Sequence, residues 1–321
     1  MTPAMKIAAI TMAFDEPFFL PLWIRHYGEA FGYENLYVID DGSTDGSAQG
    51  LGAANVMRRP RVPFDDQERA DLISLIEIEL LRTNDAVVYT DTDEFIIADP
   101  STGKTLREYL EAEPEFDFKT MIGFNVLHRT GTEAPFDMSL PVFRQRHFIQ
   151  FSIGYSKPLI TRTPVRWFPG FHGVRGGSRP RFDSNLLLFH LRMLDMDVML
   201  ERLRVRNGVQ FSSRSLEKNH GFHFRQPVAA DHLRMIGHPI ADEEFLAART
   251  NIDFVGPLLG DYMAGRIGVQ QMPEVIAEVP ARFADALVLG HPPKVVRGAA
   301  PPGVNAQGLL EGAMSLVPRA R

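Results

Sequence analysis

The sequence predicts an α/β fold, with a Rossmann-like and mostly parallel sheet, flanking helices and a smaller antiparallel portion. In the first third of the chain, short apolar runs rich in β-branched residues alternate with helical patterns. The order strand, helix, strand, helix, strand implies right-handed crossovers, which produce parallel strands with helices on both faces. Further apolar runs follow in the middle of the chain, separated by turns rich in Gly, Pro and Arg, and we assign them to the antiparallel portion.

The composition is that of a globular protein with enough apolar residues for a large core. Of the 321 residues, 45% are hydrophobic and 23% are charged, which fits one large domain or a domain with an appendage. The formal net charge of −6 argues against nucleic-acid binding through bulk positive charge. There is no cysteine, so disulfide bonds and thiolate chemistry are excluded.

The sequence predicts no membrane-spanning segment. No apolar run reaches the roughly eighteen residues that a transmembrane helix needs, and residues 1–13 suit a first strand better than a signal peptide. We therefore expect a cytoplasmic protein, with peripheral membrane association left open and the oligomeric state undetermined. We expect one domain over residues 5–206 and a C-terminal helical extension and tail over residues 207–321.

The elements of the first half follow from hydrophobic period and from turn residues. Leu20, Ile24 and Tyr27 recur at helical spacing, and Gly32 is placed to end that helix. The expected elements are strands at 6–13, at 36–39 and around Val56, and helices at 18–30 and 67–81.

The elements of the second half follow from weaker signals. Apolar runs predict strands at 118–127, 148–152, 157–162 and 186–190, and helices at 105–111, 195–206 and 243–250. From about Pro280 the chain contains two Pro-Pro pairs with several Gly and Ala. We therefore expect a poorly ordered or wrapping tail there.

The most informative stretch is 87–97, where an apolar run meets three carboxylates within four residues, Asp91, Asp93 and Glu94. Burying such a cluster is costly unless a cation or a hydrogen-bonding ligand neutralises it. Ligands bind at the carboxyl ends of strands in open α/β sheets. Asp91 and Asp93 share a face in extended chain, and their hard oxygens suit Mg²⁺ or Mn²⁺. The alternative is a charged turn that closes the strand.

A second acidic loop, Asp40-Asp41-Gly42-Ser43-Thr44-Asp45, follows the strand expected at 36–39. In a parallel sheet it lies at the same edge as Asp91, which favours a shared ligand site. The alternative is a turn made by the two acidic residues and Gly42, in which Ser43, Thr44 or Asp45 caps a short helix.

These motifs resemble glycosyltransferases of the GT-A fold, in the branch similar to families 2 and 92. Trp23-Ile24-Arg25-His26-Tyr27, followed by the acidic loop at 40–45, is similar to the opening helix and the D-D-G-S-T-D loop of that family. Asp91-Thr92-Asp93-Glu94-Phe95 is similar to its D-x-D-E-F metal motif. The likeness covers residues 6–192, and nothing recognisable lies beyond about residue 206.

A softer match combines Lys157-Pro158, His172 and the strand that ends in His190. The chain departs from the family pattern after the first strand, where Ala13-Phe14-Asp15-Glu16 replaces the usual polar set. It also lacks the Q/R-x-x-R-W sequence that accompanies the catalytic base of family 2 enzymes. The resemblance therefore leaves the base unassigned.

The resemblance implies transfer of a sugar from a nucleotide-sugar, with a UDP-linked donor expected, to a saccharide, lipid or protein acceptor. It also implies Mn²⁺ or Mg²⁺ acting as a Lewis acid on the leaving diphosphate. We expect Asp93 to be a direct metal ligand and Asp91 to contact the ribose, or the metal through water. His190 is the expected third metal ligand, the alternative being a core histidine satisfied by a backbone carbonyl. Glu94 is expected to hydrogen-bond to residues of the site without binding the metal directly.

Other residues are expected around the same donor. The resemblance implies that one of Asp40 and Asp41 accepts a hydrogen bond from the nucleotide base, and we expect Thr11 to line that pocket. His172 contacts donor or acceptor. The cations expected to meet the diphosphate are Lys157, Arg175, Arg179 and Arg192, and the aromatic residues expected as a sugar platform or as core are Trp167, Phe168 and Phe171.

An inverting transfer also needs a base that takes the proton from the acceptor hydroxyl. Asp183, Asp195 and Asp197 are the candidates downstream of the metal motif. For Asp195, which starts a predicted helix, an N-cap is the alternative role.

Two rival functions stay open. A nucleotidyltransferase or phosphoryl-transfer enzyme would use carboxylates in the same way, but the first loop lacks a glycine-rich phosphate cradle with an adjacent lysine. A non-catalytic nucleotide- or glycan-binding protein would keep the fold without turnover. If no nucleotide stabilises the protein, or if Mn²⁺ makes no difference to stabilisation by UDP, the hypothesis of a metal-dependent glycosyltransferase fails.

Overall fold

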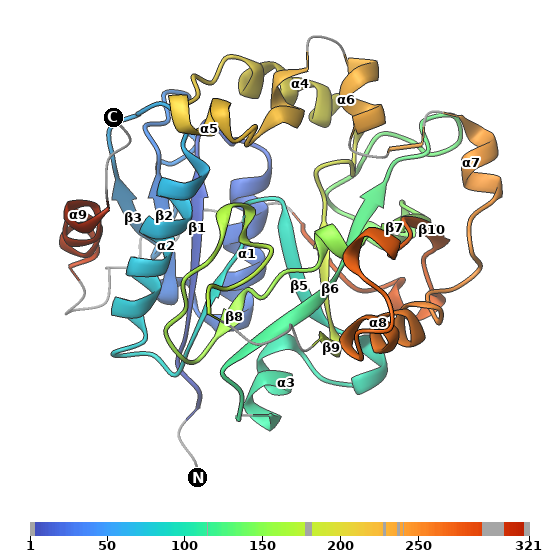
Figure 1. The fold of residues 1–321 in the computed structure, drawn as a ribbon, viewed down its shortest axis with the longest axis horizontal. Coiled ribbons are helices and arrows are strands. Elements are labelled where there is room, and N and C mark those ends of the chain that lie inside the picture. The colour runs from blue at the N-terminus through green and yellow to red at the C-terminus, as the bar shows by residue number, and fades with distance from the viewer. Residues whose placement is uncertain are drawn as a thin grey trace.

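The computed structural model describes residues 4–113, 115–176, 182–226, 229–235, 238–239, 241–290 and 305–317. Within these residues ten strands form one mixed sheet, and its main path runs β10-β7-β6-β8-β4-β1-β2-β3 (Figure 1). The predicted α/β class, with parallel strands, flanking helices and an antiparallel portion, is confirmed.

The parallel half contains β1 (Ile7–Ala13), β2 (Leu36–Asp40), β3 (Asn55–Arg58) and β4 (Ala86–Tyr89), in the order β3-β2-β1-β4. Two helices connect these strands, α1 (Phe19–Phe31) and α2 (Asp66–Leu80). All residues of β2 and β4 are buried, as expected for strands covered on both faces. Because the strands are parallel, the loops after β1, β2 and β4 emerge at one edge.

The antiparallel half begins at β8 (Ile160–Thr161), which pairs with β4 on one side and with β6 (Phe118–Leu127) on the other. β7 (Phe148–Phe151) and β10 (Val275–Glu278) continue it outward from β6. β5 (Glu94–Ala98) pairs antiparallel with β9 (Phe182–His190), and β9 runs parallel to β6. The acidic turn between β4 and β5, residues 90–94, therefore lies where the two halves meet.

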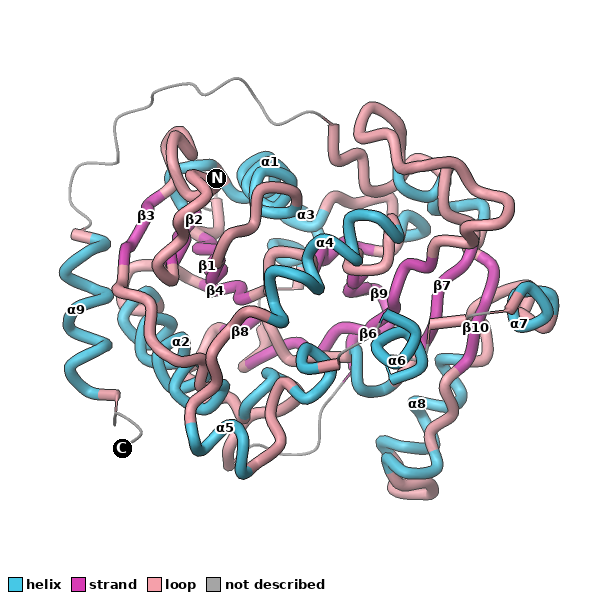
Figure 2. The backbone as a smooth tube through the Cα atoms, turned by 90° about the horizontal axis from the view of Figure 1, so that it is seen from above, coloured by secondary structure: helices cyan, strands magenta, loops and turns pink. Residues whose placement is uncertain are grey.

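Seven further helices are described: α3 (Leu106–Ala112), α4 (Met196–Asn207), α5 (Ser213–Glu217), α6 (Ala229–Met235), α7 (Asp242–Leu246), α8 (Val255–Met263) and α9 (Ala306–Leu316). Figure 1 shows α4, α5 and α6 along the top of the molecule. Figure 2, seen from that side, shows α4 crossing between the two halves of the sheet. The edge where the parallel strands end is therefore covered by chain from the second half.

Four local expectations differ from the structure. No helix follows Gly42: residues 41–50 form turns, because the Asp15 carboxylate accepts hydrogen bonds from the backbone N–H groups of Thr44 and Asp45. The strand expected at 157–162 is paired only at Ile160–Thr161, and the helix expected at 243–250 ends at Leu246. The tail expected from Pro280 contains the helix α9.

Helix α9 packs on the parallel half, far from the preceding described residues in the chain. Its Leu310 and Ala313 are buried in the same core as β1, β2 and β4, and Figures 1 and 2 place it beside β3 and α2. Chain beyond residue 206 thus returns to both halves, through α9 and through β10. The domain boundary that we predicted at residue 206 stays a prediction.

None of the helices in the described ranges combines the length and the apolar character needed to cross a bilayer.

Glu77 is a fully buried carboxyl on α2 for which we predict a pH effect on stability. Its Oε1 accepts a hydrogen bond from the Thr161 hydroxyl at 2.8 Å, and its Oε2 lies 3.4 Å from the backbone nitrogen of Val165. Burial raises the pKa of Glu77 from 4.5 to about 7. The folded state therefore binds this proton more tightly than the unfolded state, so stability is fully present below pH 4.5 and is lost as the pH rises through 7.

When the pH is raised from 4.5 to 8, the free energy of unfolding is expected to fall in the wild type. This fall should exceed that of Glu77→Gln by up to about 3 kcal/mol. Urea unfolding at both pH values measures this difference. Glu79→Gln is the control, because the Glu79 side chain is on the same helix and is 40% exposed. Its stability is expected to depend on pH as that of the wild type does. Parallel pH profiles for Glu77→Gln and the wild type would show that Glu77 titrates normally.

Candidate functional site

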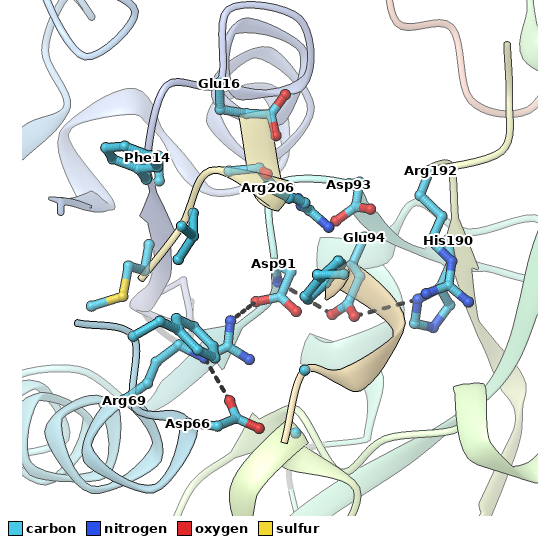
Figure 3. Close-up of a pocket in the computed structure, with 18 of the residues that line it drawn as sticks. Phe14, Glu16, Asp66, Arg69, Asp91, Asp93, Glu94, His190, Arg192 and Arg206 are labelled. Carbon is cyan, nitrogen blue, oxygen red and sulfur yellow. Dashed lines mark hydrogen bonds and ion pairs between the residues drawn. The ribbon is translucent and has the colours of Figure 1, made fainter. Parts of the chain in front are cut away.

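The candidate site is a cavity of about 450 Å³ at the carboxyl edge of the parallel strands. Its walls come from the loops after β1 and β2, the acidic turn, the segment at 152–157, the end of β9 and the chain that follows α4. Figure 3 shows the acidic residues Asp91, Asp93 and Glu94 in this cavity, with Arg69, Arg192, Arg206 and His190 around them. The two acidic loops therefore contribute to one cavity.

Side chains of helix α1 form hydrogen bonds with the acidic turn and with the start of β5. The indole Nε1–H of Trp23 donates to Thr90 Oγ1 at 2.7 Å, and the hydroxyl of Tyr27 donates to the backbone carbonyl of Glu94 at 3.0 Å. The same hydroxyl accepts from the backbone N–H of Ile96, and His26 Nε2 lies 2.9 Å from the Ile96 carbonyl oxygen. The Trp23 to Tyr27 motif thus fixes the backbone of the acidic turn.

Asp91 is bound by two side chains of the parallel half. Its Oδ1 accepts hydrogen bonds from the Tyr89 hydroxyl at 2.7 Å and from the Arg69 guanidinium at 3.2 Å. Burial raises the pKa of Asp91, but the charges of Arg69 and Lys157 lower it more, and the result is a pKa of about 2. Asp91 is therefore a carboxylate at neutral pH.

Asp93 forms a salt bridge with α4. Its Oδ2 lies 3.1 Å from a guanidinium nitrogen of Arg202, and Arg202 also binds Glu16 at 2.6 Å. Burial opposes ionisation of Asp93, but the positive charges of Arg202 and Arg206 outweigh it and hold the pKa well below its usual range. Arg202 thus connects α4 to the acidic turn and to the loop after β1.

Glu94 meets Lys157 and His190. The Lys157 ammonium donates to Glu94 Oε1 and lies 3.8 Å from Asp91 Oδ2. His190 donates its Nε2–H to the Tyr155 carbonyl at 2.8 Å, which leaves Nδ1 as the acceptor, 3.4 Å from Glu94 Oε1. Burial, with Lys157 and Arg192 nearby, lowers the pKa of His190 to about 3, so the imidazole is neutral at pH 7.

Gly123 allows Tyr155 and Lys157 to reach the cavity. A Cβ on Gly123 would lie 1.9 Å from the Tyr155 carbonyl oxygen, so only glycine permits the 153–156 segment to cross β6 this closely. The backbone N–H of Gly123 also donates to Ser156 Oγ at 2.9 Å. A glycine inside a strand pattern is the sequence signal for such an approach.

The residues expected to hold a metal are not arranged around a common point. Among the described residues, no group of three His, Asp or Glu side chains is placed to hold a metal ion. Oδ2 of Asp93 is bound to Arg202, Oδ1 of Asp91 to Arg69 and Tyr89, and Nδ1 of His190 faces Glu94. As arranged here, the predicted set of Asp91, Asp93 and His190 does not fit a divalent ion, and we derive no step through one.

The donor-pocket residues separate into two groups. Asp41 lines the cavity and pairs with Arg59 and Arg61. Asp40 does not line it: its Oδ1 accepts from the Ser43 backbone N–H at 2.8 Å, the alternative role as a turn residue. Thr11 is fully buried within β1 and does not line the cavity either.

The three carboxylates considered as the base lie outside the cavity. Asp183 is at the far end of β9, about 23 Å of strand from His190, where it binds Lys119 and accepts from the Tyr109 hydroxyl. Asp195 caps α4 by accepting from the backbone N–H groups of Asp197 and Val198. Asp197 is exposed in the first turn of α4. None of the three lines the cavity.

The remaining expected residues are distributed as follows. His172 and Arg192 line the cavity, whereas Arg175 binds Gln67 outside it. Arg179 lies outside the described residues. Trp167 and Phe171 are fully buried against Tyr89, as core residues, and Phe168 is 47% exposed.

Several lining or supporting residues were missed. They are Glu16, Arg61, Asp66, Arg69, Arg202, Arg206 and Glu274, with the aromatic residues Phe14, Phe64, Phe211, Phe222 and Phe224. Arg202 and Arg206 lie four residues apart, which places them on one face of α4. That spacing is visible in the sequence, but the position of α4 over the parallel strands is not.

Comparisons with known proteins give only weak similarity. No family model matches the sequence, and no curated protein matches it significantly. The fold is similar to that of mannose-1-phosphate geranyltransferase from Thermus thermophilus, with 14% identity and a TM-score of 0.29, over 62% of this chain and 60% of that one.

Two other solved structures show comparable likeness. One is a glycosyltransferase involved in the glycosylation of the major capsid of PBCV-1, with 13% identity and a TM-score of 0.21, over 36% of this chain and 51% of that chain. The other is CMP:2-keto-3-deoxy-manno-octonic acid synthetase complexed with CTP, with 14% identity and a TM-score of 0.24. That match covers 64% of this chain and 88% of the other chain. At this level these similarities carry no argument about activity.

Proposed function

We propose that this protein is a glycosyltransferase that takes its sugar from a nucleotide-sugar donor. One observation carries the proposal: both acidic loops of the parallel half border a single cavity with Lys157, Arg192 and Arg206. This combination suits a ligand with a polar sugar and ribose, which carboxylates bind, and with a charged diphosphate, which cations bind. A volume of about 450 Å³ is within the usual range for small-molecule sites.

In the proposed reaction, negative charge develops on the departing diphosphate, which we expect to lie beside the cations of the cavity. When the bond between the anomeric carbon and the phosphate oxygen breaks, its electron pair stays on the departing diphosphate. The acceptor oxygen bonds to the anomeric carbon and loses its proton to a base or to water. Preorganised cations stabilise the growing negative charge in such a step, and Lys157 is the buried cation at the centre of the acidic turn.

A UDP-linked donor remains the expected class. Of the two acidic residues after β2, Asp41 is the better candidate for the nucleotide base because it borders the cavity and Asp40 does not. Arg61, stacked over the Phe14 ring with 3.9 Å between guanidinium carbon and ring centroid, adds a flat surface beside it. The acceptor class stays a saccharide, lipid or protein.

A thermal-shift panel tests the function. UDP, GDP, CMP and TDP are each added at about 100 times Kd or above, with Mn²⁺ or with EDTA, where binding stabilises the folded state by about 2.7 kcal/mol or more. We expect UDP to raise Tm. Release of UDP from UDP-sugars then separates sugar transfer from nucleotidyl transfer, which releases diphosphate from a nucleoside triphosphate.

A protein that no nucleotide stabilises, with or without Mn²⁺, contradicts the proposal. Stabilisation without release of UDP from any donor supports the non-catalytic alternative. The Mn²⁺ arm also tests the metal predicted from the sequence.

A further inference from the structure

Two guanidinium groups in the cavity form no salt bridge in the described part of the chain. They belong to Arg192, just after β9, and Arg206, near the end of α4. Figure 3 shows Arg206 beside Asp93 and Arg192 beside His190. The other cations that the structure describes at the acidic turn, Arg69, Arg202 and Lys157, are bound to carboxylates, so these two differ from them.

Each carboxylate of the acidic turn has its own cation. Asp91 is bound by Arg69, Asp93 by Arg202 and Glu94 by Lys157. Arg202 and Arg69 are in addition held by Glu16 and Asp66. None of these carboxylates therefore depends on a hydrogen bond from Arg192 or Arg206.

The two guanidinium groups are partly exposed, and the carboxylates near them are already paired with other cations. The guanidinium carbon of Arg206 lies 4.6 Å from the centre of the Phe224 ring, and this guanidinium donates no hydrogen bond within the described residues. Burial, with the charge of Arg202 nearby, lowers its pKa to about 10. Nε of Arg192 is buried without a hydrogen-bond partner, and its only described polar contact is a 3.5 Å approach to the Tyr155 hydroxyl.

Because no carboxylate of the described residues forms a salt bridge with Arg192 or Arg206, their N–H groups can bind an anion that enters the cavity. Guanidinium groups also match the geometry of phosphate oxygens, which they bind through paired N–H groups. The diphosphate of a nucleotide-sugar is the anion that the proposed function brings to this cavity.

We propose that Arg192 and Arg206, together with Lys157, bind the diphosphate of the donor, and that this binding needs no divalent cation. The inference rests on the proposed function and deepens it, because it names the groups that hold the leaving group. It also explains why the carboxylates expected as metal ligands are occupied by Arg69, Arg202 and Lys157.

The test measures binding of two probes, UDP and inorganic diphosphate, by calorimetry on full-length protein treated with EDTA. The wild type is expected to bind both. Arg192→Gln and Arg206→Gln are each expected to weaken both by about 10-fold or more, since a hydrogen bond to a charged group is lost. Uridine, which lacks phosphate, is expected to bind equally to wild type and variants.

Arg204→Gln is the matched control. Arg204 is on the same helix, two residues from Arg206, and its side chain is 77% exposed beside Glu201. Its replacement removes the same charge and is expected to change neither affinity. Arg206→Lys, which keeps the charge but not the paired N–H groups, is expected to recover part of the binding.

The outcomes separate this inference from the proposed function. Binding of UDP only with Mn²⁺ overturns the inference and leaves the function standing. Unchanged affinity in both Gln variants, or an equal loss in Arg204→Gln, also overturns it. If inorganic diphosphate binds through the two arginines while no nucleotide binds, the anion site stands and the nucleotide-sugar function falls.

Discussion

Replacing Lys157 with methionine is expected to lower the rate of sugar transfer by about 100-fold or more, the usual loss when one preorganised group is removed from a developing charge. Lys157 is buried, binds Glu94 and lies 3.8 Å from Asp91. Without it, the diphosphate meets two carboxylates that have lost a shared cation. Turnover per folded molecule, measured as release of nucleoside diphosphate, is the observable.

Lys119→Met provides the comparison for Lys157→Met. Lys119 is a second buried lysine with two carboxylate partners, Glu113 and Asp183, in a separate hollow on the antiparallel half. Each change removes a cation that two carboxylates share, so both are expected to reduce stability. Only Lys157→Met is expected to reduce transfer by the folded protein. Equal transfer rates for the two variants would remove Lys157 from the reaction.

Arg202→Met is expected to lower the free energy of unfolding by about 3–5 kcal/mol, the usual cost of leaving buried charges uncompensated. Arg202 joins Glu16 in the loop after β1 and Asp93 in the acidic turn, and all three side chains are at most 10% exposed. Its loss leaves two carboxylates without their cation. It also removes the ion pairs that join α4 to the acidic turn and to the loop after β1.

Urea unfolding measures the effect of Arg202→Met, with Arg204→Met as the control on the same helix. Arg204 is largely exposed, and Glu201 is its ion-pair partner among the residues that the structure describes, so its replacement is expected to change stability by less than about 1 kcal/mol. A loss below about 1 kcal/mol for Arg202→Met would mean that Glu16 and Asp93 find other cations. Arg206, four residues along α4, would then be the first to examine.

The sequence predicted the parallel half well because its signals are local. Apolar runs at 6–13 and 36–39 are long enough to identify buried strands, and Gly32 ends α1 with a positive φ of 93°, as a glycine can. The antiparallel half was less predictable. β8 is only two residues long, and it pairs with β4 and β6, which are both distant from it in sequence. The length of such a strand depends on those partners and cannot be predicted from its own residues.

The residues of the candidate site that come directly after parallel strands could be predicted from the sequence. Asp41, Asp91, Asp93 and Glu94 all line the cavity, since parallel strands deliver their following residues to one edge. The proposed bases failed to reach it for an equally simple reason. Asp183 is the second residue of β9, whose last residue, His190, borders the cavity, so nearly the whole length of the strand separates them.

By itself the sequence determined the class of fold, the position of the acidic turn and the neighbourhood of Asp91 and Asp93. Only the tertiary structure decided which cations accompany them, because Arg69, Lys157 and Arg202 come from three distant segments. Hydrophobic period is written into neighbouring residues, whereas a salt bridge between segments depends on how whole elements pack. For that reason a stretch that reads as a metal site in isolation is, in the folded chain, surrounded by arginine and lysine.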